Sequence, residues 1–259
     1  NLRSINHDVD FEFAMRYGNP SIRSGLESLK QRGVTDLLLL PMFPHYAQAT
    51  TESSLKHAHL QLKAMNWSPN LLEMGHFETA EEFIGPLSES IRPHLTEDTH
   101  LLFSYHGLPV SHVKRIDRSK AHCQTVEACC TVKCEANSLC YGRHCNETTM
   151  AVVERLGLKP DQWSLSYQSR LGPVKWLEPS TTQMVEALVK KGVKKLAIVA
   201  PAFLADGLET LEELDIGIRE EFMEHGGTEL KVINCLNDDE QWVRGLEQLI
   251  AKEFEQAVA

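Results

Sequence analysis

Short apolar runs alternate with amphipathic stretches along most of the chain, and this alternation limits the fold more than any other feature. It is typical of βαβ units, in which helices bury both faces of a parallel sheet. We expect strands at residues 11–17, 36–42, 71–76, 100–105, 163–168, 195–201 and 230–234. We expect helices at residues 21–32, 51–65, 79–91, 147–156, 181–191, 207–225 and 238–256. The sequence therefore predicts an α/β fold with parallel sheets and flanking helices.

The chain has 259 residues, which is enough for two modest domains. We predict a first domain over residues 1–95 and a second over residues 96–236, with a cysteine-rich insert at 111–145. The last helix, at 237–259, is predicted to pack back on the first domain. The chain opens without Met directly into an expected strand, so we expect part of the first domain to be missing.

Charge and hydropathy exclude several classes of partner. The net charge of −10 is spread over the expected helices, which argues against nucleic acid as a partner. The longest apolar run, near residues 37–42, is far shorter than the roughly 18 residues of a membrane span. Any membrane contact would therefore be peripheral, and we expect a cytoplasmic protein.

Six of the seven cysteines fall within the 23 residues from 123 to 145. They are Cys123, Cys129, Cys130, Cys134, Cys140 and Cys145. A secreted disulfide framework would spread its cysteines over the fold, so this local cluster indicates metal ligation. Four thiolates suit either a tetrahedral zinc ion or a 2Fe-2S cluster. Zinc remains an alternative because His122 and His144 lie near the cysteines in the sequence and histidine is a common zinc ligand.

Two further features suggest a ligand site. His106 follows an expected strand, and in open α/β sheets the carboxyl ends of the strands line the ligand crevice. A histidine that only bonds to backbone at a strand end is the structural alternative. Acidic residues recur at spacings of three, four and seven, which places them on one face of a regular helix; they are Asp206, Glu209, Glu213 and Glu220. A solvated helix face is the alternative for these carboxylates.

Several segments together resemble one known family. The motif around His106 reads LFSYHGLP at 102–109, and the matching segments are AMRYGNP at 14–20, YQSRLG at 167–172, WLEP at 176–179 and PAFLADGLETLEE at 201–213. These motifs resemble the ferrochelatases in the same order and over nearly the whole chain. The resemblance implies two Rossmann-like domains of the class II chelatase type.

The resemblance also implies a function. Ferrochelatases are lyases that insert Fe²⁺ into protoporphyrin IX to form haem, with release of two protons. His106 and Glu209 match the family's catalytic, metal-facing pair, and Glu213 continues the metal path. The chain departs from the family pattern at Gly217, where many relatives have a third carboxylate. A histidine near neutrality can accept protons or bind iron, and a carboxylate offers a hard oxygen ligand.

Substrate-binding residues are also implied by the matching segments. Arg16 and Tyr17 stand where relatives approach the porphyrin, and an arginine suits a propionate because its guanidinium donates two hydrogen bonds. A structural salt bridge is the alternative for Arg16. Candidates for the apolar wall of the pocket are Phe43, Tyr46, Trp176 and Phe203, although aromatic residues at strand ends more often belong to the core.

Some bacterial ferrochelatases are similar in holding a 2Fe-2S cluster on an internal segment, so we favour that cluster over zinc. We favour Cys123, one of Cys129 and Cys130, and one of Cys134 and Cys140 as ligands, and retain Cys145 as a further candidate.

Two other functions of the protein remain as alternatives. One is a non-catalytic iron-sulfur redox or sensor protein on a chelatase scaffold, against which His106 and Glu209 argue. The other is a chelatase for another tetrapyrrole. The oligomeric state is not predicted.

Overall fold

The computed structural model describes residues 9–258 and contains two parallel sheets. The small sheet pairs β1 (Asp36–Leu39) with β2 (Asn70–Glu73). The large sheet has the order β4-β3-β5-β6, formed by Trp163–Gln168, Thr99–His106, Lys195–Val199 and Glu229–Val232. Every pairing in the two sheets is parallel. The predicted α/β fold with parallel sheets and flanking helices is therefore confirmed.

Helices connect the strands. They are α1 (Ile22–Gln31), α2 (Ser53–Ala64), α3 (Glu81–Ile91), α4 (Val110–Ile116), α5 (Tyr141–Leu156), α6 (Thr181–Lys190), α7 (Arg219–Glu224) and α8 (Glu240–Val258). Two short 3₁₀ helices are η3 (Arg92–His94) and η4 (Glu135–Asn137), and two π-helices are η2 (Gln48–Glu52) and η5 (Glu209–Ile218). In the part of the chain that the structure describes, no helix is both long and apolar enough to cross a membrane.

Both faces of the large sheet are buried, which explains the continuous apolar run of its central strand β3. Leu101, Phe103 and Tyr105 pack in the core that includes α3, α5 and α8. Leu102 faces the opposite core, which α6, η5 and α7 supply. Because successive side chains of a strand point to opposite faces, a strand with helices on both sides buries both sets of side chains and favours apolar residues along its length.

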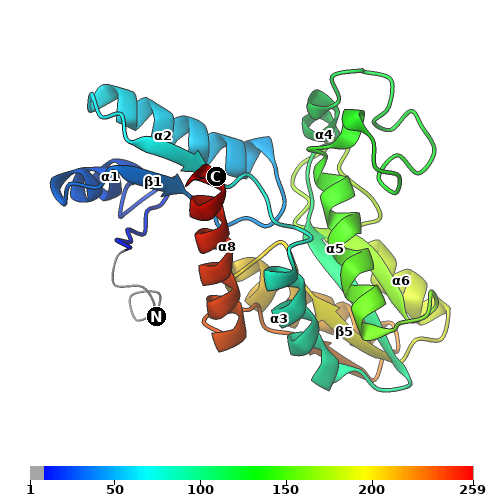
Figure 1. The fold of residues 1–259 in the computed structure, drawn as a ribbon. Coiled ribbons are helices and arrows are strands. Elements are labelled where there is room, and N and C mark those ends of the chain that lie inside the picture. The colour runs from blue at the N-terminus through cyan, green and yellow to red at the C-terminus, as the bar shows by residue number, and fades with distance from the viewer. Residues whose placement is uncertain (1–8, 259) are drawn as a thin grey trace.

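Helix α8 joins the two sheets. It packs against α3 and contacts both strands of the small sheet, and Figure 1 shows it between the lobe of α1 and α2 and the rest of the molecule. Trp242 of α8 is 2% exposed and stacks on Phe77 with ring centroids 6.0 Å apart. Helix α3 lies in the core of the large sheet although it precedes the predicted boundary near residue 95. The domain limits themselves stay a prediction.

The strand predicted at residues 11–17 is wrong. Only Met15 makes a bridge, to Ser21, and neither strand of the small sheet pairs with this segment. The Glu12 side chain of the segment bonds to α1 and to the residue after it instead, since it accepts from Ser28 at 2.7 Å and from Arg32 at 2.6 Å. An alternating apolar pattern forms a strand only where a sheet edge accepts its backbone.

Two helix predictions need correction. Helix α5 begins at Tyr141 rather than at 147, inside the predicted insert at 111–145, and its early turns are held by Arg143 donating to Glu147 at 2.6 and 2.7 Å. The predicted regular helix at 207–225 is a π-helix from Glu209 to Ile218 and an α-helix only after it. Regular hydrophobic spacing does not distinguish these helix types, because both bury one face.

Candidate functional site

The order of the strands creates a crevice at the carboxyl ends of β3 and β5. The chain leaves β3 towards β4 on one side, and leaves β5 towards β6 on the other. Ligands of open α/β sheets bind where the strand order reverses in this way. His106 ends β3, and the segment after β5 carries Phe203 and Glu209. The main sequence-predicted site residues therefore flank one switch point.

His106 is partly exposed and its ring is oriented by its own turn. Nδ1 lies 2.6 Å from the carbonyl oxygen of Gly107, so Nδ1 carries the proton and donates it. Nε2 then keeps its lone pair for a proton or a metal. The Phe203 ring lies beside this imidazole, with centroids 6.1 Å apart. The geometry thus commits Nδ1 to the turn and leaves Nε2 as the ring nitrogen available for chemistry.

Gly107 is required by close packing behind His106. A Cβ at this position would lie 2.8 Å from the carbonyl oxygen of Gln168 and 3.2 Å from Cε3 of Trp176. The Trp176 indole is itself fixed, because Nε1 donates to the carbonyl oxygen of Leu171 at 3.0 Å. Trp176 therefore lies directly behind the His106 turn and is only partly buried.

Glu213 is held by residues at the end of β4. Its two carboxylate oxygens accept hydrogen bonds from the backbone N–H and the hydroxyl of Ser169, each at 2.6 Å. Ser169 has a positive φ of 63°, a conformation that a non-glycine residue adopts only when its surroundings hold it there. The buried Gln168 donates to the backbone carbonyl of Glu209 at 2.9 Å. These bonds fix η5 to the strand next to β3.

The acidic residues do not form the regular stripe that an α-helix would give. Glu209 and Glu213 lie on η5 and are partly exposed, whereas Glu220 lies on α7. The Asp206 carboxylate instead binds the segment after β6, since it accepts hydrogen bonds from the Asn237 side chain at 2.7 Å and from the backbone N–H of Cys235 at 3.1 Å. Burial acts to raise the pKa of Asp206, but these hydrogen bonds and that from Thr210 lower it overall. π-helical turns occur frequently at functional sites.

Arg16 and Tyr17 lie on the other lobe. The Arg16 Nε donates to the hydroxyl and carbonyl oxygens of Ser53 at 3.0 and 3.2 Å, and its guanidinium lies 4.5 Å from the centre of the exposed Tyr17 ring. Arg16 also lines an open groove of about 330 Å³ beside η2 and α2, together with Gln48, Glu52, Ser53, Lys56, His57 and Leu60.

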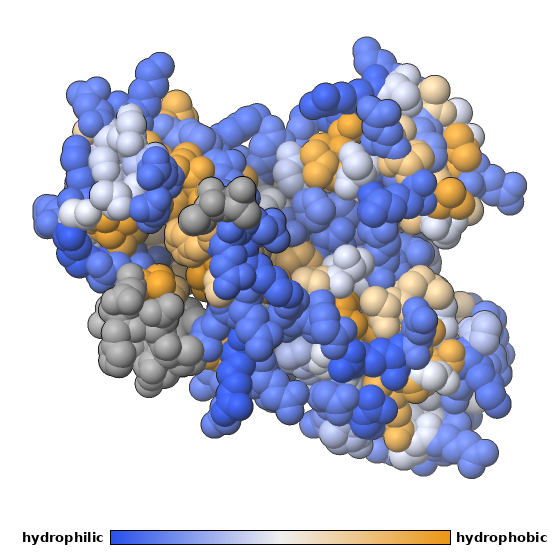
Figure 2. Space-filling model, in the orientation of Figure 1, coloured by the Kyte–Doolittle hydropathy of each residue, from blue (hydrophilic) through white to orange (hydrophobic). Residues whose placement is uncertain are grey.

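Phe43 and Tyr46 follow β1 in the chain and are both partly buried. The Tyr46 hydroxyl donates to Glu52 at 2.9 Å, and burial together with this carboxylate raises the pKa of Tyr46 to about 12. The molecule is notched between the lobe of α1 and α2 and the part that holds α4 (Figure 2). Arg16 and Tyr46 thus lie beside η2 and α2, whereas His106 and Glu209 lie at the carboxyl ends of the large sheet.

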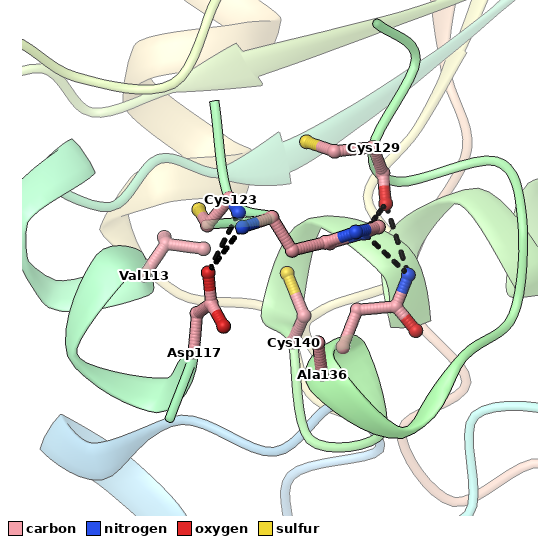
Figure 3. A pocket seen from close by; sticks show the side chains of 8 residues that line it. Val113, Asp117, Cys123, Cys129, Ala136 and Cys140 are labelled. Atoms are coloured by element: carbon pink, nitrogen blue, oxygen red, sulfur yellow. Dashed lines mark hydrogen bonds between the residues drawn. The ribbon is translucent and has the colours of Figure 1, made fainter. Parts of the chain in front are cut away.

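Thiols gather beside α4 and the start of α5. Cys123, Cys129 and Cys140 line a small cavity of about 10 Å³, with His122 and Asp117 also in its wall (Figure 3). Asp117 accepts the backbone N–H groups of His122 and Cys123 at 2.9 and 2.8 Å. Hydrogen bonds to this carboxylate hold its pKa well below the ordinary range.

The remaining cysteines differ in position. The sulfur atoms of Cys130 and Cys129 lie 3.8 Å apart. A hydrogen bond from the Cys130 thiol, with backbone N–H groups at the start of α5, lowers the pKa of Cys140. Cys134 lies 3.7 Å from Nε2 of His122. Cys145 is fully buried in the main core, where burial raises its pKa well above the ordinary value.

One polar cluster, in which Glu78 and His144 are buried and His76 is exposed, was not predicted. His76, Glu78 and His144 bring their ligand atoms within 4.8 Å of one another, and they come from the segment after β2 and from α5. The pKa of Glu78 is lowered to about 2. Burial acts to raise this pKa, but the hydrogen bond to His76 and the electrostatic attraction of His144 lower it by more. No spacing in the sequence joins these residues, because only tertiary packing brings 76–78 to 144.

Comparisons with known proteins agree with this arrangement. The family model of ferrochelatase matches residues 1–254. Ferrochelatases of Bdellovibrio bacteriovorus and Pseudomonas syringae are 41% and 40% identical over 91% and 92% of the chain, which spans 70% of each relative. The structure titled SirB from Bacillus subtilis with Fe3+ shares the fold, with a TM-score of 0.67 at 10% identity over 97% of this chain and 85% of that one. The chain therefore belongs to the ferrochelatase family.

Proposed function

We propose that this protein inserts Fe²⁺ into protoporphyrin IX to form haem, and thus acts as a metal chelatase of the lyase class. The observation that carries the proposal is the site at the switch point. There Nδ1 of His106 is committed to its own turn, the Glu213 carboxylate binds the end of β4, and the backbone of Glu209 is held by Gln168. Family membership supports the same reaction.

The reaction breaks two pyrrole N–H bonds, forms bonds from iron to the ring nitrogens and releases two protons. His106 Nε2 is suited to accept a proton or to bind the incoming ion. Glu209, which starts η5 and is partly exposed, supplies a hard oxygen ligand. Glu213 is held by Ser169 and continues the carboxylate path. Phe203 and Trp176 supply apolar wall on this side, and Phe43, Tyr46, Tyr17 and Arg16 face the porphyrin from the other lobe.

Porphyrin fluorescence, which is lost on metallation, tests the proposal in the full-length protein. We expect His106→Ala to reduce kcat by at least about 100-fold, in line with loss of a general base. Glu209→Gln should also reduce it, whereas Glu212→Gln, at the exposed neighbouring position, should leave it unchanged. A His106→Ala protein as active as wild type would exclude the catalytic role.

We also propose a 2Fe-2S cluster on the cysteine segment, held by Cys123, Cys140, Cys134 and one of Cys129 and Cys130. Three of these thiols, those of Cys123, Cys129 and Cys140, line one cavity, and Cys134 lies 3.7 Å from His122 in its wall. Four thiolates suit a 2Fe-2S cluster, which would supply a one-electron redox centre. Among the described residues, no three thiol sulfurs lie within 4.8 Å of one another. Cys145 is left out because it packs in the core.

The absorption spectrum of the purified protein checks this assignment. We expect a brown protein with visible absorption that Cys140→Ser abolishes and Cys235→Ser leaves intact, since Cys235 lies outside the segment. A colourless preparation containing one zinc per chain would contradict the cluster. Reduced cysteines at this density also support a cytoplasmic location.

A further inference from the structure

The unpredicted cluster lies where two loops of the small sheet meet α5. The Nδ1 atom of His76 lies 2.6 Å from the Oε2 atom of Glu78, and Nε2 of His144 lies 3.5 Å from Oε1 of the same carboxylate. His144 and Glu78 are buried, whereas the His76 side chain is 35% exposed. Two histidines and a carboxylate at this spacing suit either a divalent cation or a hydrogen-bonded network.

The hydrogen bonds of His144 favour the hydrogen-bonded network over a cation site. The backbone N–H of Tyr46 donates to Nδ1 at 3.2 Å, so Nδ1 has no proton. Nε2 must then carry the proton of the neutral ring, and it donates to the carbonyl oxygen of Ser138 at 2.9 Å. A metal ion at Nε2 would require the other tautomer, in which Nδ1–H would oppose the Tyr46 N–H. The arrangement therefore holds a neutral histidine with both ring nitrogens in use.

A second attachment lies one turn further along α5. The Thr148 hydroxyl donates to the carbonyl oxygen of Glu78 at 2.7 Å, and it accepts from Nε2 of His45 at 2.9 Å. The loop after β1, which carries His45 and Tyr46, and the loop after β2, which carries Glu78, thus both bond to α5. Burial lowers the pKa of His144 and keeps the ring neutral despite the nearby Glu78 carboxylate.

The same helix supports the other wall of the site. The Tyr141 hydroxyl, in the first turn of α5, donates to the backbone carbonyl of His106 at 2.8 Å. One helical turn therefore connects the backbone of His106 to the backbone of Tyr46 through Tyr141 and His144. The spacing of the two walls depends on these two bonds.

We propose that His144 is a positioning residue for the porphyrin site, because it holds the Tyr46 loop against the helix that supports His106. This inference rests on the proposed chelatase function, and it assigns His144 to porphyrin binding rather than to the proton and metal steps. Loss of the Tyr46 bond should therefore weaken porphyrin binding and leave turnover unchanged.

Two substitutions separate the two bonds of His144. His144→Asn places an amide oxygen near the position of Nδ1 and keeps an acceptor for Tyr46, but it loses the donor to Ser138. His144→Gln keeps a donor near Nε2 and loses the acceptor. Each variant gives up one hydrogen bond, so a merely structural role predicts equal effects.

The experiment measures KM and kcat for porphyrin, and the dissociation constant by fluorescence quenching, with the full-length protein. We expect His144→Gln to raise KM and the dissociation constant about tenfold, because a buried N–H loses its acceptor. His144→Asn should stay within about twofold of wild type, and kcat should be unchanged in both. Equal effects of the two variants, or a larger effect of His144→Asn, would overturn the inference.

Two controls keep the outcomes distinct. Thr148→Val removes the second attachment while preserving side-chain shape, and it should also raise KM severalfold without changing kcat; an unchanged KM would count against the proposal. If wild type binds porphyrin but does not metallate it, the proposed function fails. The quenching measurements on the His144 variants would still test the positioning role.

Discussion

At the scale of single residues, the motif around His106 serves two purposes. His106 supplies the reactive side chain, and Gly107 supplies the space for close packing behind it. His106 needs its Nε2 free, and Gly107 lets the backbone pass close to Gln168 and Trp176. The glycine is therefore set by the space behind the histidine rather than by an unusual φ. The sequence motif marks both positions, but it does not say which neighbour excludes a side chain.

Gly107→Ala tests this close approach. The added Cβ would meet a carbonyl oxygen at 2.8 Å, so we expect a loss of about 1–3 kcal/mol in unfolding free energy and reduced chelatase activity. Urea denaturation measures the stability change. Gly75→Ala is the matched control because no atom lies within 4 Å of its Cβ position, and it should change stability by less than about 0.5 kcal/mol.

At the scale of elements, α5 and η5 organise the two sides of the site. Helix α5 binds the loops of the small sheet through His144 and Thr148, and η5 is fixed to β4 through Glu213 and Ser169. Both elements differ from the sequence prediction: α5 begins at Tyr141 rather than at 147, and η5 is a π-helix rather than a regular α-helix. The reason is that their local form depends on hydrogen bonds to residues more than 40 positions away along the chain.

The buried histidines along α5 predict a pH dependence of stability. Burial, with a further contribution from His144, lowers the pKa of His45 from 6.5 to about 3. Between these values the unfolded chain binds a proton that the folded chain excludes, so stability falls as the pH falls. From pH 6.5 to pH 5 the loss from His45 is about 1.5 kcal/mol.

His45→Gln removes this titration while keeping a donor for Thr148. We expect urea denaturation at pH 6.5 and pH 5 to show a smaller difference for this variant than for wild type. His225→Gln, at the exposed residue that follows α7, should keep the wild-type difference. An unchanged difference in His45→Gln would mean that His45 does not set the acid limit.

At the scale of the whole molecule, α8 couples the lobes. Trp242 packs on Phe77, which follows β2, and on Phe83 of α3, with ring centroids 6.0 Å apart in each pair. Lys252 and Glu82 form an ion pair along the same contact. One helix therefore links the small sheet to the core of the large sheet.

Trp242→Ala should lower the unfolding free energy by about 3–5 kcal/mol, because it leaves a large cavity in this joint. Thermal and urea denaturation measure the loss. Leu60→Ala, whose side chain is 63% exposed on α2, should change stability by less than about 0.5 kcal/mol. A Trp242→Ala protein with wild-type stability would show that α8 does not hold the lobes together.

The sequence by itself determined the α/β class, the parallel strands and the family, because burial on both faces and short motifs are local properties of the chain. It also marked His106, Glu209 and Glu213. Only the tertiary structure decided that Glu12 bonds to Ser28 of α1 and that η5 is a π-helix. It also decided that Cys145 lies in the core while Cys123, Cys129 and Cys140 line one cavity. The His76, Glu78 and His144 cluster likewise exists only after packing, since its hydrogen bonds join segments that no sequence period connects.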